Sequence, residues 1–388
     1  MSVLLYLVLP FCVAFVAVAW VYPMILSIAL AKQIVDCPDA RKVQQRPIPV
    51  LGGVAIFIGV TVGMMWMVLT TGSKELLPLY LVLAAMLYMG VMDDILGLSP
   101  RLRLVVEVLM ALFLVVAGLG SLNDFHGLFG LDAIPHWVAF PLTLVAVVGI
   151  INALNLLDGI DGLSSGYSVM ACLLFAVLFY RTEHTTMAMI AAATAGALVP
   201  FFCHNVFGYA SKMFIGDGGT LLLGALLAAF VLQAIDRQSP CAVSEGVGEC
   251  LVPFVVAVLS IPVFDTLRVM TTRLCRGVSP FHPDKSHLHH ILLELGCSHL
   301  GGTVIIVGLN LLIVAAWWSL MLLGYSVHVQ LSVVVSLSLL FTFGLYAFLT
   351  YHIVHQTRIY RVLHRWSALS HCEHHAVFRR IRQTIDQR

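Results

Sequence analysis

Charged side chains are scarce in this chain. Only 11% of its 388 residues are Asp, Glu, Lys or Arg, whereas 60% are hydrophobic and the mean hydropathy is +0.98. A soluble domain with a polar surface cannot be built from that composition. The low charge therefore excludes a soluble globular protein and indicates a polytopic membrane protein.

Three further features are missing from the sequence. The first 31 residues lack a basic start and an obvious small-residue cleavage site, so we expect a retained first helix and not a removed signal peptide. The nine cysteines include no Cys-x-x-Cys pair, which argues against a zinc framework. No convincing internal repeat of the kind found in many transporters is present. One disulfide is a hypothesis, between Cys241 and Cys250 in a predicted outer loop.

Apolar runs long enough to cross a bilayer predict an all-α fold with about 11 transmembrane helices. They cover residues 4–30, 50–70, 77–92, 103–121, 136–152, 166–181, 186–203, 218–235, 251–267, 303–323 and 329–350. We expect residues 1–350 to form a single transmembrane domain and residues 351–388 to form a basic, His-rich tail.

Basic residues are unevenly shared between the two sides when successive loops are assigned to them alternately. Most fall on one side, including the tail arginines from Arg358 to Arg388, whereas the other side has Lys74, Arg181 and Arg237. Cytoplasmic loops of membrane proteins carry the excess of Lys and Arg. The sequence therefore predicts a periplasmic N-terminus and a cytoplasmic C-terminus.

The same assignment gathers nearly every polar cluster on the cytoplasmic side. Five loops carry these clusters: 36–53, 92–103, 152–165, 204–220 and 268–302. A membrane protein that meets a soluble cytosolic substrate requires such clustering on one face.

The third of these loops places two amides and two carboxylates at three-residue intervals, as Asn152, Asn155, Asp158 and Asp161. Residues three apart share a face of a helix, and the glycine after each aspartate lets the backbone approach a ligand closely. The pattern predicts a polar site at the membrane boundary, which either an enzyme or an ion pathway could use.

Two more acidic clusters lie on the same predicted side. Asp93 and Asp94 close an apolar run and indicate a divalent-metal or base site, or a solvated helix end with Arg101 and Arg103 as counter-charges. Asp217 opens a helix after a glycine-rich turn, where phosphate and metal both suit the helix N-terminus. A simple helix cap is the alternative for Asp217.

Histidines and basic residues dominate the last and the first of the five loops. Carboxylates and amides prevail in the other clusters and suit a hard cation better than zinc. Imidazoles of His287, His289 and His290, beside Lys285, would therefore hold phosphate oxygens. The basic, proline-restricted loop 36–53 predicts contact either with lipid head groups or directly with a phosphorylated lipid.

Five motifs carry a family resemblance. They are Pro-Ile-Pro-Val-Leu-Gly-Gly (47–53), Met-Asp-Asp (92–94), Asn-Leu-Leu-Asp-Gly-Ile-Asp-Gly-Leu (155–163), Phe-Ile-Gly-Asp-Gly-Gly (214–219) and Ser-Pro-Phe-His-Pro-Asp-Lys-Ser-His-Leu-His-His (279–290). In this order on one face they resemble the polyprenyl-phosphate N-acetylhexosamine-1-phosphate transferase family of integral membrane enzymes. The likeness is greatest to the bacterial undecaprenyl-phosphate N-acetylglucosamine-1-phosphate transferases that initiate O-antigen and enterobacterial common antigen synthesis.

The resemblance implies a reaction in which undecaprenyl phosphate attacks the β-phosphorus of UDP-N-acetylglucosamine, giving undecaprenyl-diphosphate N-acetylglucosamine and UMP with Mg²⁺ or Mn²⁺. It implies the metal ligands Asp217, Asp93 and Asp94; the catalytic residues Asp93, Asp94, Asp158, Asp161 and His287; and the substrate-binding residues Asn155, Asp158, Asp161, Phe214, Arg268, His287, His289, His290 and Lys42. Because a phosphate nucleophile with a second pKa of about 6 is already largely deprotonated, we expect Asp93 to bind metal or position substrate, and a base role is the alternative.

The resemblance also implies a multi-pass enzyme of the bacterial inner membrane whose catalytic transmembrane domain has its site on the cytoplasmic face. The bilayer and the two substrates are the expected partners, a homodimer is suggested by analogy, and no nucleic acid is expected. Two alternatives stay open: the same fold acting on another UDP-N-acetylhexosamine, and a membrane transporter, since charged groups near membrane helices often mark ion routes. Glu107, within a predicted span, has no role in either account.

Overall fold

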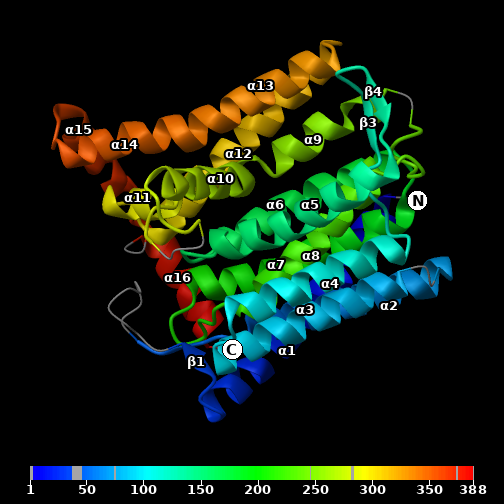
Figure 1. Cartoon of the computed structure of the whole chain (residues 1–388). Helices are drawn as coiled ribbons and strands as arrows, with labels where there is room; N and C mark the ends of the chain where they lie inside the picture. Colours follow the sequence, from blue (N-terminus) through cyan, green and yellow to red (C-terminus); the bar gives the residue numbers. More distant parts are fainter. Residues whose placement is uncertain are drawn as a thin grey trace.

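The structure is a computed structural model that describes residues 3–36, 46–73, 76–244, 246–280, 284–372 and 375–387. Long helices run side by side in one bundle, and the two ends of the chain lie at opposite ends of it (Figure 1). The helices are α1 (Leu9–Ala31), α2 (Gly52–Thr71), α3 (Leu77–Leu96), α4 (Pro100–Val116), α5 (His136–Leu157), α6 (Leu163–Arg181), α7 (Thr185–Phe207), α8 (Gly216–Ile235), α9 (Leu251–Val258), α10 (Ser260–Cys275), α11 (Leu288–Glu294), α12 (His299–Leu322), α13 (Val327–Leu339), α14 (Leu345–Val354), α15 (Arg358–Ser367) and α16 (Ala376–Asp386).

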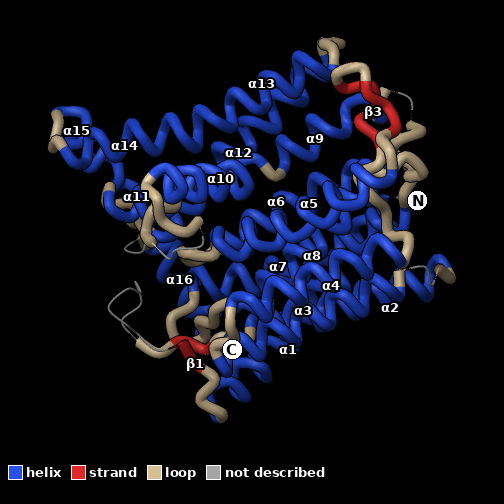
Figure 2. Tube along the Cα trace, in the orientation of Figure 1, coloured by secondary structure: helices blue, strands red, loops and turns tan. Residues whose placement is uncertain are grey.

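Strands are few and short. An antiparallel pair joins β1 (Val35–Asp36) to β2 (Ile48–Pro49), and a second antiparallel pair joins β3 (Asp124–Leu128) to β4 (Leu131–Ala133). The two pairs lie at opposite ends of the bundle (Figure 2). The predicted helical, multi-pass membrane fold is confirmed, although these four short strands depart from the all-α fold that the sequence predicts.

The number of predicted spans is only partly confirmed. In the described part of the chain, nine helices are long and apolar enough to cross a membrane, or ten if the bent pair α9–α10 counts as one span. The sequence predicts an eleventh span over residues 103–121. The helix found there, α4, has 17 residues and includes Arg101, Arg103 and Glu107. Its shortness and its charges leave the count of eleven unconfirmed.

Helix α8 lies at the centre of the bundle, and almost all of its residues are buried. Small residues allow its N-terminal turn to approach its neighbours closely, as is common between membrane helices. A Cβ added at Gly90 of α3 would lie 2.4 Å from the backbone nitrogen of Gly218, and one added at Gly53 of α2 would lie 2.3 Å from that of Gly219. The start of α8 is therefore fixed by backbone contact with two other helices.

The predicted span 251–267 is broken into α9 and α10, which meet at an angle of 59°. Pro262 explains the break, because its ring clashes with the carbonyl four residues earlier and it has no N–H to donate. The carbonyl of Val258 is satisfied instead by the Tyr167 hydroxyl, at 2.5 Å, and by the Asn310 amide, at 3.0 Å. The amide oxygen of Asn310 accepts the N–H of Ile261. Internal partners of this kind are required where a helix breaks inside a membrane.

The tail beyond residue 350 folds back onto the bundle. In this segment α15 caps the end of α11, because the ring Nδ1 of His364 lies 2.7 Å from the carbonyl oxygen of Leu295. Ser370 accepts the N–H of Ser298 at the start of α12. Two tail side chains therefore serve as structural contacts of the helical bundle.

The hypothesis of a disulfide between Cys241 and Cys250 is wrong for this structure, since both thiols are free. Each sulfur contacts a different polar side chain. The Cys241 sulfur lies 3.1 Å from the Thr182 hydroxyl, and the Cys250 sulfur accepts a hydrogen bond from Gln330 at 3.4 Å. The two side chains thus have separate polar partners.

Candidate active site

The five polar loops predicted to share one face do converge in the structure. They line a cavity of about 1020 Å³ at one end of the bundle. Its lining includes Asp94, Asn155, Asp158, Asp161, Lys212, Phe214, Asp217, His290 and His299. The predicted gathering of these clusters is therefore found, although residues 37–45, and Lys42 with them, lie outside the described residues.

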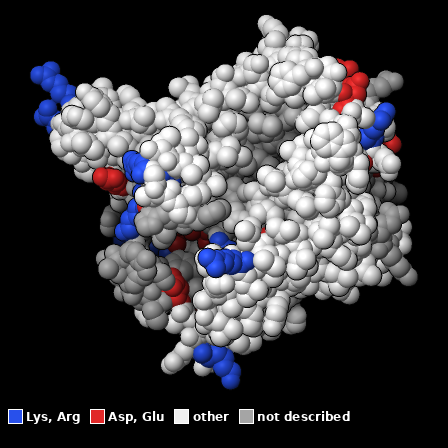
Figure 3. All heavy atoms as spheres, viewed as in Figure 1, with Lys and Arg blue, Asp and Glu red and all other residues white. Residues whose placement is uncertain are grey.

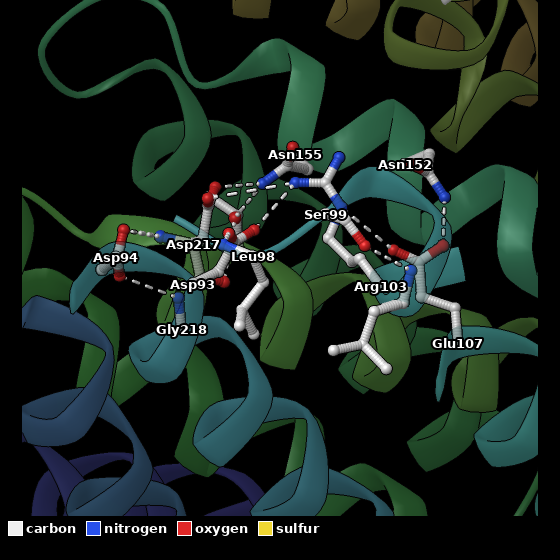
Figure 4. A network of polar contacts seen from close by, with 12 residues as sticks. Asp93, Asp94, Leu98, Ser99, Arg103, Glu107, Asn152, Asn155, Asp217 and Gly218 are labelled. Carbon is white, nitrogen blue, oxygen red and sulfur yellow. Dashed lines mark hydrogen bonds and ion pairs between the residues drawn. The ribbon is translucent and has the colours of Figure 1, made fainter. Parts of the chain in front are cut away.

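Asp94 caps the N-terminus of α8 from a different helix. Its two carboxylate oxygens accept the backbone N–H groups of Asp217, at 3.0 Å, and Gly218, at 3.3 Å (Figure 4). Gly216, just before them, has a φ of +70°, and a Cβ at this position would lie 2.5 Å from an Asp94 oxygen. Only glycine satisfies both requirements. The cap expected as an alternative for Asp217 is thus supplied by Asp94.

The side chain of Asp217, which does not cap α8, faces the cavity. The amide nitrogen of Asn155 donates to its Oδ1 at 2.7 Å and lies 2.8 Å from the Thr220 hydroxyl. The side chain of Asp217 is 35% exposed, whereas that of Asp93 is 12% exposed. Asp217 is therefore the more accessible of these two carboxylates, and the 152–165 loop holds it in place.

Arg103 connects the acidic clusters (Figure 4). Its Nη1 lies 3.4 Å from an oxygen of Asp93 and 3.9 Å from one of Asp217. Its Nε lies 3.6 Å from Glu107, whose other oxygen accepts a hydrogen bond from Asn152. Asp93 also accepts the N–H of Leu98, at 2.8 Å, so its carboxylate is held from two sides.

Asp158 and Asp161, the other two carboxylates of the third loop, differ in their surroundings. Asp158 accepts a hydrogen bond from the Ser164 hydroxyl, and desolvation by the protein around the cavity raises its pKa to about 7. Asp161 lies 2.8 Å from His299 and pairs with Lys212. Burial pushes the pKa of Asp161 upward, but the hydrogen bonds and charges of these two partners hold it below its ordinary value.

The three histidines predicted to bind diphosphate do not stand alike. His290 lines the cavity. His289 is buried against Gly159, where a Cβ would lie 1.9 Å from the ring nitrogen, and burial lowers the pKa of His289 to about 3. His287 is also buried, with its Nδ1 held 2.9 Å from Asp265. Burial therefore favours the neutral form of His289, and its role in holding the diphosphate stays a prediction.

Arg268 supports His287 from behind. It donates to the same Asp265 carboxylate at 2.7 Å, and its guanidinium lies 3.7 Å from the ring centre of Tyr346. Neither Arg268 nor His287 lines the cavity. Arg268 thus helps to position the loop that carries the histidines.

Phe214 does line the cavity, with the Lys212 ammonium 5.7 Å from its ring centre.

The carboxylates of the site suit a hard cation whose remaining coordination positions are filled by substrate and water. Among the described residues, no three His, Cys, Asp or Glu side chains are arranged to hold a metal ion by themselves. Mg²⁺ in phosphoryl-transfer sites is usually held by one or two carboxylates together with substrate phosphates and waters. Asp217, with Asp93 beside it, offers such a partial set of oxygens.

Sequence reasoning missed several residues that the structure brings to the site. Asp265 orients His287, Lys212 pairs with Asp161, His299 lies 2.8 Å from Asp161, and Glu107 holds Arg103. Each is a single titratable residue outside the five motifs. The signal that could have found Asp265 is its spacing of three residues from Arg268 within an apolar run, which places both on one helix face.

Comparison with known proteins agrees with this site. Residues 76–235 match glycosyl transferase family 4. The undecaprenyl-phosphate α-N-acetylglucosaminyl 1-phosphate transferase of Pasteurella multocida is 31% identical over 301 residues, covering 76% of this chain and 79% of that protein. The enzyme of the same name from Salmonella typhi is 30% identical over 277 residues, covering 70% and 72%. These likenesses favour an enzyme over a transporter, and the chain belongs to the polyprenyl-phosphate N-acetylhexosamine-1-phosphate transferase family as a membrane phosphoglycosyl transferase.

Proposed function

We propose that the enzyme transfers N-acetylglucosamine 1-phosphate from UDP-N-acetylglucosamine to undecaprenyl phosphate. The products are undecaprenyl-diphosphate N-acetylglucosamine and UMP. The observation that carries the proposal is the position of Asp217, which faces a cavity of about 1020 Å³ at the N-terminus of α8 and is fixed there by Asn155. The names of the relatives support the choice of substrates.

The chemistry requires two phosphate anions to meet. An oxygen of the lipid phosphate forms a bond to the β-phosphorus, and the bond from that phosphorus to the bridging oxygen breaks, so that UMP leaves with the electron pair. Catalysis of such a transfer rests on alignment and on neutralising charge. The cations Lys212 and Arg103 are suited to that task.

Within this proposal, Asp217 and Asp93 would hold Mg²⁺ or Mn²⁺ near the oxygens of the donor diphosphate. The bound ion would neutralise charge that develops on those oxygens. Asp93 serves as a positioning group, because Arg103 and the N–H of Leu98 already hold its carboxylate. An Asp93→Asn variant whose lost rate returned at higher pH would instead identify a general base.

The remaining cavity residues divide between the nucleotide and the sugar. Asp158, Asp161 and Asn155 would contact donor hydroxyls or amides, Phe214 would pack on uracil, and His290 would approach the diphosphate. All five line the cavity. His287 and His289 would fix the shape of the wall that His290 belongs to, as their burial supports.

We further propose that the cavity opens to the cytoplasm from a bacterial inner membrane, with the N-terminus in the periplasm. The convergence of the basic, predicted cytoplasmic loops on one cavity supports this orientation. The product would then begin a surface polysaccharide such as O-antigen or enterobacterial common antigen. Cysteine-reactive labelling of intact spheroplasts tests the orientation, since a cysteine placed at Asp132 should react from outside and one placed at Arg380 should not.

A panel of donors tests the sugar. Detergent-purified enzyme would be incubated with Mg²⁺, undecaprenyl phosphate and UDP-linked N-acetylglucosamine, N-acetylgalactosamine, N-acetylfucosamine or N-acetylquinovosamine, with UMP release as the signal. We expect the highest kcat/KM with UDP-N-acetylglucosamine. Release with only one of the other donors would keep the reaction and refute the sugar.

A further inference from the structure

The C-terminal helix α16 reaches the same cavity as the five predicted loops. Arg382 of α16 is one of the cavity-lining residues, together with Arg46 and Tyr209. Basic and acidic side chains border a hollow at the lower left of the molecule (Figure 3). No motif of the sequence points to this tail segment.

The docking of α16 is specific and polar. The carboxylate of Asp386 accepts the backbone N–H groups of Tyr209, at 3.1 Å, and Ser211, at 3.0 Å, and the Ser211 hydroxyl at 2.7 Å. Phe378 of α16 packs edge-on against Phe207, with 5.1 Å between ring centres. These contacts attach α16 to the loop that leads into Phe214 and Asp217.

Two guanidinium groups converge at this end of the cavity. That of Arg46 lies 3.9 Å from the ring centre of Tyr209, and that of Arg382 lies 6.0 Å from the same centre. Arg382 also donates its Nε to the carbonyl oxygen of Phe207 at 3.3 Å. Within the described ranges, neither guanidinium is paired with a carboxylate. Both keep N–H donors for an anion, and arginine is well suited to bind phosphate.

We propose that Arg382 and Arg46 form a phosphate-binding subsite at the mouth of the cavity, so that the C-terminal helix completes the substrate site. The proposal rests on the proposed function, because both of its substrates carry phosphate. Asp217 and Asn155 face the cavity from α8 and α5, whereas the two arginines belong to the segments that β1–β2 and α16 bring to it. A substrate that reaches from one group to the other would be held at both ends.

The test compares Arg382→Gln with Arg382→Lys and with Arg380→Gln in the full-length, detergent-purified enzyme. Arg380 is the matched control, since it is exposed on the same helix and does not line the cavity. Equilibrium binding of UDP and of undecaprenyl phosphate would be measured separately, at low and high ionic strength. We expect Arg382→Gln to weaken binding of one of them by about tenfold, with Arg382→Lys and Arg380→Gln within about threefold of the unsubstituted enzyme.

The outcomes distinguish a phosphate-binding role of Arg382 from a purely structural role of this side chain. Weaker binding of UDP alone assigns the subsite to the nucleotide sugar, and weaker binding of undecaprenyl phosphate alone assigns it to the acceptor. A subsite also requires that the salt dependence of binding fall in Arg382→Gln, since a charge contact is screened by salt. Equal binding of both ligands by Arg382→Gln and Arg380→Gln would overturn the proposal, as would equal losses in Arg382→Gln and Arg382→Lys with an unchanged salt dependence.

The same measurements distinguish this proposal from the proposed function. If the unsubstituted enzyme releases UMP and Arg382→Gln binds both ligands normally, only the subsite is refuted. If the unsubstituted enzyme binds UDP but releases no UMP with any donor, the proposed reaction is refuted, and the binding data still decide the subsite.

Discussion

Arg103 lies 3.6 Å from the carboxylate of Glu107, one turn further along α4. Glu107 is only 1% exposed, and Asn152 of α5 donates to its other oxygen. The pair gives Glu107 a role that the sequence does not suggest. It fixes the guanidinium that reaches both Asp93 and Asp217.

Replacing Glu107 by Gln should therefore lower kcat while leaving the two KM values nearly unchanged. The amide keeps the size of the side chain but removes the charge that orients Arg103, so we expect a loss of about tenfold in kcat. UMP release measured against each substrate checks this. Glu183→Gln, at an acidic position outside the cavity lining, is the control, and an unaltered kcat in Glu107→Gln would show that Arg103 does not need its partner.

Asp94 should prove important for stability through its cap on α8. Asn can still accept an N–H of that helix, whereas Ala cannot, and loss of an N-cap costs about 1 kcal/mol. We expect Asp94→Ala to unfold at a lower temperature than Asp94→Asn in the same detergent. Equal unfolding temperatures for these two variants would contradict the capping role.

Gly90→Ala should both destabilise the protein and reduce its activity. The new methyl group would meet the backbone of Asp217 and Gly218 at 2.4 Å, and overpacking of this kind costs about 1–3 kcal/mol. Gly149→Ala is the control, since no described atom apart from the adjacent backbone of its own helix lies within 4 Å of its added Cβ. We expect Gly90→Ala to unfold at a lower temperature and to release UMP more slowly than Gly149→Ala. Equal unfolding temperatures and equal rates for the two variants would mean that α8 can shift without loss of stability or activity.

His289 should make the protein acid-sensitive. Burial lowers its pKa from the ordinary 6.5 to about 3, so below pH 6.5 the unfolded chain binds a proton that the folded protein does not. Stability is then complete above pH 6.5 and falls as the pH drops toward 3, by at most about 1.4 kcal/mol per pH unit.

Unfolding of the unsubstituted protein and of His289→Gln across pH 4–8 measures this contribution. We expect the variant to lose less stability on acidification, and exposed His136→Gln to behave like the unsubstituted protein. A pH profile of His289→Gln that is parallel to that of the unsubstituted protein would show that His289 is not the group responsible.

Hydropathy and loop charge predict much of this fold because membrane helices must be long and apolar, and because polar clusters in a membrane protein need partners. The convergence of Asp94, Asn155, Asp217 and His290 on one cavity follows from assigning their loops to one face. Features that depend on contacts between distant parts of the chain cannot be predicted from the sequence in this way. The capping of α8 by Asp94 joins residues 123 or more positions apart, and nothing local marks it.

Mean hydropathy along the sequence likewise predicts neither the break between α9 and α10 nor the docking of the tail. Hydropathy predicts one continuous span over 251–267, although Pro262 interrupts this helix. The Asn310 side chain of another helix forms hydrogen bonds with the backbone groups that the break leaves unpaired. The tail composition suggests only an exposed basic segment. Asp386 and Phe378 attach it to the site through backbone N–H groups and an aromatic ring that no spacing predicts.

The most direct test of the account is UMP release by Asp217→Asn. Purified enzyme would be supplied with Mg²⁺, undecaprenyl phosphate and UDP-N-acetylglucosamine, with Asp132→Asn, at an exposed carboxylate in β4, as the control. We expect Asp217→Asn to lose at least about a thousandfold in kcat while its unfolding temperature and the activity of Asp132→Asn stay close to those of the unsubstituted enzyme. Near-normal UMP release by Asp217→Asn would contradict the central claim that this carboxylate at the start of α8 is the core of the catalytic site.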